Sequence, residues 1–66
     1  MNITKQDKER EKNVKTLQKY LRTIEESYIN LYDNGAEMTR KQLEDLEFKI
    51  TINLENAESL TKELFI

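Results

Sequence analysis

The sequence lacks cysteine, histidine, proline and tryptophan, and it contains one glycine. Without cysteine and histidine the chain cannot form disulfides, thiolate or imidazole catalytic groups, or the common zinc sites. Only carboxylates remain as ligands for a metal. Without proline, no side chain interrupts a helix from within. These absences favour a small helical protein, and we expect it to hold neither a cofactor nor a metal.

Long apolar runs are also missing, although 36% of the residues are hydrophobic and 36% are charged. A membrane-spanning helix needs about 20 apolar residues in succession, and the opening residues lack the apolar core of a signal peptide. We therefore predict one cytoplasmic domain over residues 1–66 that does not enter a membrane.

The apolar residues form two stripes with heptad spacing, one on each side of Gly35. The first stripe contains Val14, Leu17, Leu21, Ile24, Tyr28 and Leu31. The second contains Leu43, Leu46, Ile50, Asn53, Ala57, Leu60 and Leu64. If the chain folds back at Gly35, residues whose numbers add to 74 face each other through six layers. This shared register predicts an all-α fold, an antiparallel two-helix hairpin over about 4–33 and 39–65.

Capping residues mark the ends of these predicted helices. Thr39 and Gln42 have the spacing of a capping box at the start of the second helix, and Thr4 with Asp7 forms a weaker one at the start of the first. The Asp33-Asn34-Gly35 segment tolerates the left-handed conformation that often closes a helix. We therefore expect a short loop at about 34–38.

The segment 46–54 alternates apolar and polar residues, which by itself is typical of a strand. Such a strand would have no mate within the chain, and the flanking heptads place the segment in a helix. We interpret it as helix, with strand pairing across a dimer as the alternative.

A hairpin of this size buries only one seam between its helices, which is little for a stable domain. We expect self-association to cover the open side of each seam. Two hairpins would then form a homodimeric four-helix bundle.

Basic residues recur every three or four positions near the start of the chain, and we call them the basic stripe. Its members are Lys5, Lys8, Lys12, Lys15, Lys19 and Arg22. Residues 1–22 hold seven basic and three acidic side chains, whereas residues 23–66 hold four basic and ten acidic ones. Such a row can bind a phosphate backbone or an acidic protein surface. The alternative is a solvated helix face, with Lys19 paired to Glu55 across the hairpin.

Two other features are candidate interaction sites. Phe48 and Ile52 lie one turn apart and point away from the seam, and Ile29 and Tyr32 widen the apolar side of the first helix. Exposed apolar side chains grouped in this way are typical of a partner or dimer interface. Asn53 at a seam position either selects the register and oligomeric state or is hydrated at the seam's edge.

No arrangement of residues indicates catalysis. Neighbouring carboxylates such as Glu25 and Glu26, or Glu44 and Asp45, diverge by about 100° on a helix and cannot share a substrate. A hairpin also offers no deep pocket. We expect a protein that is not an enzyme.

The opening Thr4-Lys5-Gln6-Asp7-Lys8 resembles the first residues of the Rop family, small plasmid proteins that bind paired RNA loops. The resemblance implies a dimeric four-helix bundle and contact with RNA through the first helix. The family's RNA-contacting aromatic would fall on Thr16, and its central contact positions on Lys12 and Tyr20. Of the family's contact residues, only the lysine at Lys5 matches.

These observations lead to one functional prediction and two alternatives. The prediction is a small non-enzymatic interaction protein, a homodimer that regulates or inhibits another protein by binding to it. The first alternative is a Rop-like hairpin that binds structured RNA or a duplex through the basic stripe. The second is a purely structural module that forms bundles.

Overall fold

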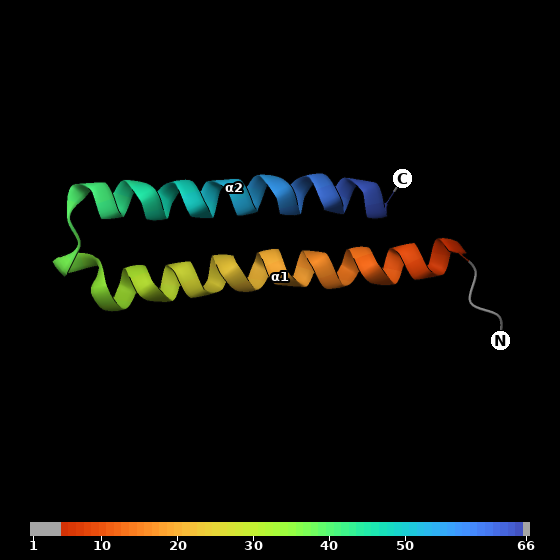
Figure 1. The fold of residues 1–66 in the computed structure, drawn as a ribbon, viewed down its shortest axis with the longest axis horizontal. Helices are drawn as coiled ribbons and strands as arrows, with labels where there is room; N and C mark the ends of the chain where they lie inside the picture. The colour runs from red at the N-terminus through yellow and green to blue at the C-terminus, as the bar shows by residue number, and fades with distance from the viewer. Residues whose placement is uncertain (1–4, 66) are drawn as a thin grey trace.

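In the computed structural model, the backbone is described for residues 5–65 and the side chains for residues 7–65. The chain forms two helices, α1 (Lys5–Asn34) and α2 (Arg40–Leu64), joined by a single 3-10 turn, η1 (Gly35–Glu37). Figure 1 shows α1 and α2 running antiparallel side by side, with the turn at one end and both termini at the other. The all-α hairpin predicted from the two stripes is confirmed. Thr4, the predicted cap of the first helix, lies outside the described residues.

The strand alternative for residues 46–54 is wrong. This segment lies within α2, and residues 5–65 contain no strand. The capping box that starts α2 is confirmed, because the Gln42 backbone N–H donates to Thr39 Oγ1 at 3.2 Å and the Thr39 N–H donates to Gln42 Oε1 at 2.9 Å. This reciprocal pair satisfies two backbone donors that the first turn would otherwise leave unpaired.

The predicted left-handed end of the first helix is also wrong. No residue between 5 and 65 has a positive φ, and Asn34 has φ −123°. Instead, α1 tightens into η1, whose Gly35 carbonyl accepts a hydrogen bond from the Met38 N–H at 3.2 Å. Gly35 is useful here for its size, because a Cβ at this position would lie 3.2 Å from Leu31 Cδ1.

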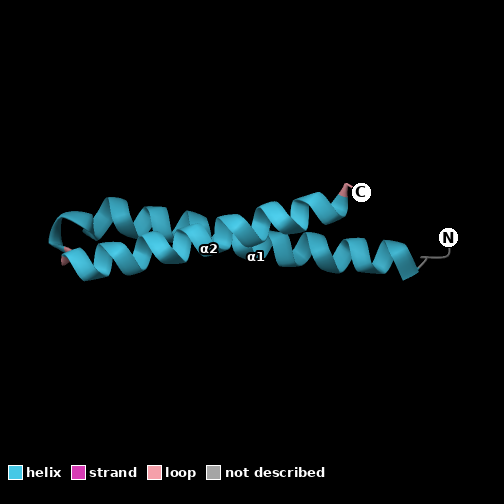
Figure 2. Ribbon diagram, turned by 90° about the horizontal axis from the view of Figure 1, so that it is seen from above, coloured by secondary structure: helices cyan, strands magenta, loops and turns pink. Residues whose placement is uncertain are grey.

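The hairpin is a single layer, with extents of 53 × 19 × 12 Å. Its centre lies between the helices, where Ile24, Ile50 and Ala57 are buried beside one polar residue, Ser27. Figure 2, turned by 90° from Figure 1, shows how thin this layer is. A two-helix layer can enclose few side chains, and among those described none is completely buried.

The predicted seam of α2 is confirmed from Leu46 onward, since Leu46, Asn53, Leu60 and Leu64 are partly buried on the same side as Ile50 and Ala57, whereas Leu43 is exposed. The predicted seam of α1 is correct only in part. Leu17 and Ile24 face α2, but Val14, Leu21 and Tyr28 remain 40–51% exposed.

Polar residues take the places of those three side chains in the α1 seam. Asn13, Tyr20 and Ser27, each one residue earlier in the chain, are the more buried set. Ser27 is only 3% exposed, and its hydroxyl donates to the Thr23 carbonyl at 2.7 Å. Because its own helix satisfies the hydroxyl, this small polar side chain can be buried where the helices meet.

Candidate protein interaction surface

The hairpin has two broad faces, and they differ in chemistry. On one face, a groove between the helices is lined by Tyr28, Leu31, Leu43, Leu46, Glu47, Ile50, Thr51 and Leu54. Val14 and Leu21 precede Tyr28 at heptad spacing and continue this face along α1, and Phe65 follows Leu54 after about three turns. We call this surface the apolar face, and its exposed apolar side chains are Val14, Leu21, Tyr28, Leu31, Leu43, Leu54 and Phe65.

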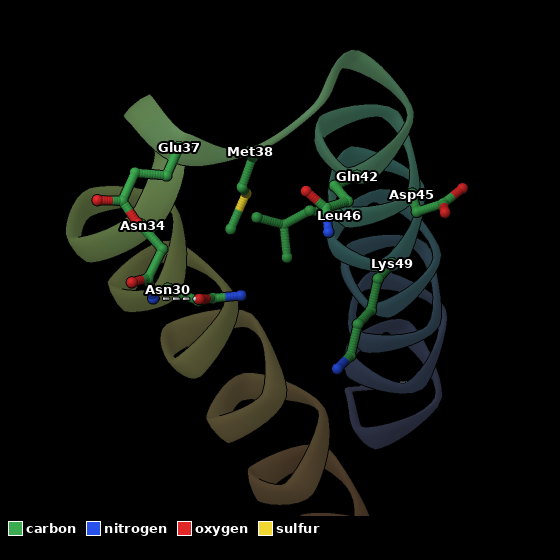
Figure 3. A pocket seen from close by; sticks show the side chains of 8 residues that line it. All are labelled: Asn30, Asn34, Glu37, Met38, Gln42, Asp45, Leu46 and Lys49. Atoms are coloured by element: carbon green, nitrogen blue, oxygen red, sulfur yellow. Dashed lines mark hydrogen bonds between the residues drawn. The ribbon is translucent and has the colours of Figure 1, made fainter.

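The opposite face is polar. Toward the termini it is lined by Thr16, Tyr20, Asn56, Ser59, Leu60 and Glu63. Near the turn, Figure 3 shows Asn30, Asn34, Glu37, Gln42, Asp45 and Lys49 around Met38 and Leu46, whose side chains point toward each other. Asn34 Nδ2 donates to Asn30 Oδ1 at 2.8 Å. Water can solvate this polar face well, whereas the apolar face has few groups to bind water.

The four residues predicted as an interface are all exposed, but they do not form one patch. Phe48 is 68% exposed and Ile52 is 38% exposed. Each lies two residues from the buried Ile50, about 200° around the helix, so both lie on the outer edge of α2, away from α1. Ile29 and Tyr32 belong to α1 and are exposed as well, with Tyr32 91% accessible.

The basic stripe lies along the outer side of α1. Lys8, Lys12, Lys15, Lys19 and Arg22 are all exposed, and the side chain of Lys5 lies outside the described residues. Lys15 pairs with Glu11 at 3.1 Å within the helix.

The expected pairing of Lys19 with Glu55 is absent from the ion pairs of the described side chains, all of which join residues four apart in one helix. Exposed pairs of this kind contribute about 0.3–0.5 kcal/mol each. The stripe is therefore a solvated row of positive charge rather than a bridge to α2.

Asn53 is partly buried in the seam, and its side-chain amide donates to the Lys49 carbonyl at 2.8 Å. The amide is therefore bonded to its own helix. A role for Asn53 in selecting the oligomeric state stays a prediction.

The apolar face is the surface that sequence reasoning missed. Heptad spacing alone does not show which residues complete the α1 seam beside positions 17, 24 and 31. Positions 14, 21 and 28 fit this spacing as well as positions 13, 20 and 27 do. The available signal was two small residues, Ser27 and Ala57, which lie at different levels of the hairpin and are both buried between the helices.

The described residues contain no group of three or more acidic side chains placed to hold a metal ion. Neither helix, over the same residues, has an apolar stretch able to cross a bilayer. Comparisons with protein-family models, curated proteins and solved structures found no match to this chain. The resemblance to the Rop family therefore rests on the short helical hairpin and the opening residues alone.

Proposed function

We propose that this chain is a small non-enzymatic interaction protein that acts as a homodimer and regulates or inhibits another protein by covering part of its surface. The observation that carries the proposal is the apolar face, where apolar side chains of both helices remain 36–85% exposed along the hairpin. Contiguous exposed apolar surface marks protein interfaces more often than free surface.

The total surface supports the same conclusion. The chain exposes 5929 Å², whereas a compact protein of this mass exposes about 4,400 Å². Each buried Å² of apolar surface contributes about 25 cal/mol. Association is therefore the favoured way for this chain to gain the burial that one hairpin lacks.

The outer edge of α2 provides a second surface, separate from the apolar face. Phe48 and Ile52 point away from α1, so a dimer formed through the apolar face leaves them accessible to a target protein. Aromatic side chains such as that of Phe48 are enriched in the buried core of protein interfaces.

The test is affinity capture from a lysate of the source cells, run with and without nuclease, followed by mass spectrometry. We expect one protein to be retained after nuclease by the wild-type chain and lost with the double variant Phe48→Asp/Ile52→Asp. The control Lys41→Asn/Ser59→Asp lowers the net charge of the chain by the same two units without changing Phe48 or Ile52 and should retain it. Equal retention by all three chains would refute this binding surface, and a dimer that retains nothing would indicate the structural module.

Nucleic-acid binding is the second candidate, and the exposed basic stripe favours it, because among its described side chains only Lys15 forms an ion pair. In that case the captured material disappears with nuclease. Affinity for structured RNA would fall by about 0.7–0.9 log units per log unit of salt for each phosphate contact. Reversing Lys12, Lys15 and Lys19 to glutamate would abolish it, and absence of binding at low salt would exclude this candidate.

A further inference from the structure

We propose that the apolar face is covered by a second copy of this chain that packs antiparallel to the first, with the two turns at opposite ends of a four-helix bundle. In this dimer α1 packs on the partner's α1, and α2 packs on the partner's α2. The inference rests on the homodimer of the proposed function and specifies its orientation and contacts.

Most exposed side chains of the apolar face are spaced symmetrically about one leucine in each helix. On α1, Val14 and Tyr28 lie seven residues before and after Leu21. Leu43 on α2 and Phe65, the residue that follows α2, lie eleven residues before and after Leu54. In an antiparallel pair of identical helices, a two-fold axis at the midpoint places each residue opposite the partner's residue that lies equally far on the other side of the midpoint. A symmetric apolar stripe therefore packs on the same stripe of the partner.

Leu21 and Leu54, the midpoints of the two symmetric sets, lie at the same level of the hairpin. Residues whose numbers add to about 74 lie opposite each other, as Leu31 and Leu43 do in the groove. Leu21 and Leu54 are within one residue of this rule, which is about 1.5 Å along a helix. A single two-fold axis can therefore pass beside both leucines and serve both helices.

Three of the contacts that follow pair apolar side chains. Leu21 meets the partner's Leu21, Val14 meets the partner's Tyr28, and Leu43 meets the partner's Phe65. The same axis brings Arg10 beside the partner's Tyr32, since both lie eleven residues from Leu21. A guanidinium over an aromatic ring is a favourable contact, and it gives the 91% exposed Tyr32 a partner.

The charges of α1 agree with this orientation. Residues 7–22 contain six basic and three acidic side chains, whereas residues 23–34 contain three acidic and no basic ones. When α1 packs antiparallel on the partner's α1, the basic half of each helix lies along the acidic half of the other. This arrangement is attractive at both ends of the bundle.

The area is sufficient for a stable dimer. A face of 53 × 19 Å covers about 1,000 Å² per copy, or about 2,000 Å² in total, which exceeds the roughly 1,600 Å² of a standard interface. The opposite face, with its asparagines and carboxylates, would bury polar groups over the same area and is disfavoured.

The arrangement with both turns at the same end matches less well. There, α1 would pack on the partner's α2, which places Tyr28 against the partner's Glu47 and Val14 against the partner's Thr61. A carboxylate would then be buried against an aromatic ring without a cation. In the antiparallel orientation Glu47 lies instead beside the partner's Thr61, each seven residues from Leu54, and the threonine hydroxyl can donate a hydrogen bond to the carboxylate.

The chain has no cysteine, so single cysteines can test the arrangement directly. A disulfide forms only where two Cα atoms come within about 7 Å. Under mild oxidation in a glutathione buffer, Leu21→Cys alone should shift from 7.9 kDa to twice that mass on a non-reducing gel. The control Arg22→Cys, one residue along and pointing outward, should stay single, and circular dichroism confirms that both remain helical.

Three outcomes would overturn the inference, and each leaves a different part of the proposed function standing. If Leu21→Cys cross-links only when mixed with Leu54→Cys, the turns lie at the same end. If neither cross-links although light scattering shows a doubled mass, the dimer uses another face. If the wild-type mass is that of one chain at all concentrations, the homodimer itself fails, while capture through Phe48 and Ile52 is tested separately.

Discussion

Ser27 provides the sharpest test of how α1 faces α2, because the heptad pattern places it outside the seam and the structure buries it. It is 3% exposed, next to the buried Ile24 and Ile50. Replacing Ser27 by leucine inserts a larger branched side chain where the helices approach closely, and overpacking of this kind costs about 1–3 kcal/mol. Leucine also forms helix slightly better than serine. We expect a net loss of about 1–2.5 kcal/mol.

The assay is urea or thermal unfolding of the Ser27→Leu variant, followed by helical ellipticity at one fixed chain concentration, because the stability of a dimer depends on concentration. In a domain of this size, 1 kcal/mol shifts the melting temperature by about 4–8 °C. The matched control is Glu26→Leu, at the exposed neighbouring position, which should change stability by less than about 0.5 kcal/mol. If Ser27→Leu is as stable as the control, Ser27 is not at the helix interface and the orientation of α1 described here is wrong.

Three further predictions concern the turn, the cap and the apolar face. Gly35→Ala should change stability by less than about 1 kcal/mol in thermal unfolding, because no positive φ is required and the half-exposed Leu31 can move away from the new Cβ; a larger loss would indicate a left-handed glycine. Thr39→Ala should cost about 1 kcal/mol through loss of the capping box, measured by urea unfolding, and an unchanged midpoint would contradict that role. Leu54→Asp should reduce the mass in sedimentation equilibrium to the 7.9 kDa of one chain while the spectrum stays helical; a retained dimer would exclude the apolar face.

The hairpin was predictable because its signals are local and redundant. The capping box at Thr39 and Gln42 depends on residues three apart, and the α2 seam from Leu46 to Leu64 repeats at heptad spacing. The shared register of the two stripes then requires an antiparallel pair. The end of α1 was not predictable from Gly35, because a glycine is used both for a left-handed cap and for a close approach, and only the path of the chain distinguishes them.

The candidate site was predictable only in part. The basic stripe and the outward Phe48 follow from helical periodicity alone, since a residue two positions from a buried one must face away. The apolar face does not follow in this way. Its recognition depends on Ser27 being buried and Leu21 being exposed, which reverses the order that hydrophobicity suggests.

By itself, the sequence determined two helices, their lengths, their antiparallel register and the charge of each segment, because these depend on periodicity, capping and composition along the chain. Tertiary structure decided how far α1 is rotated about its own axis. That rotation is a balance between burying Leu21 and Tyr28 and letting the backbones approach at Ser27 and Ala57. A polar side chain that forms its hydrogen bond within its own helix can be buried between the helices. Polarity alone therefore could not decide which face of α1 remains exposed to solvent.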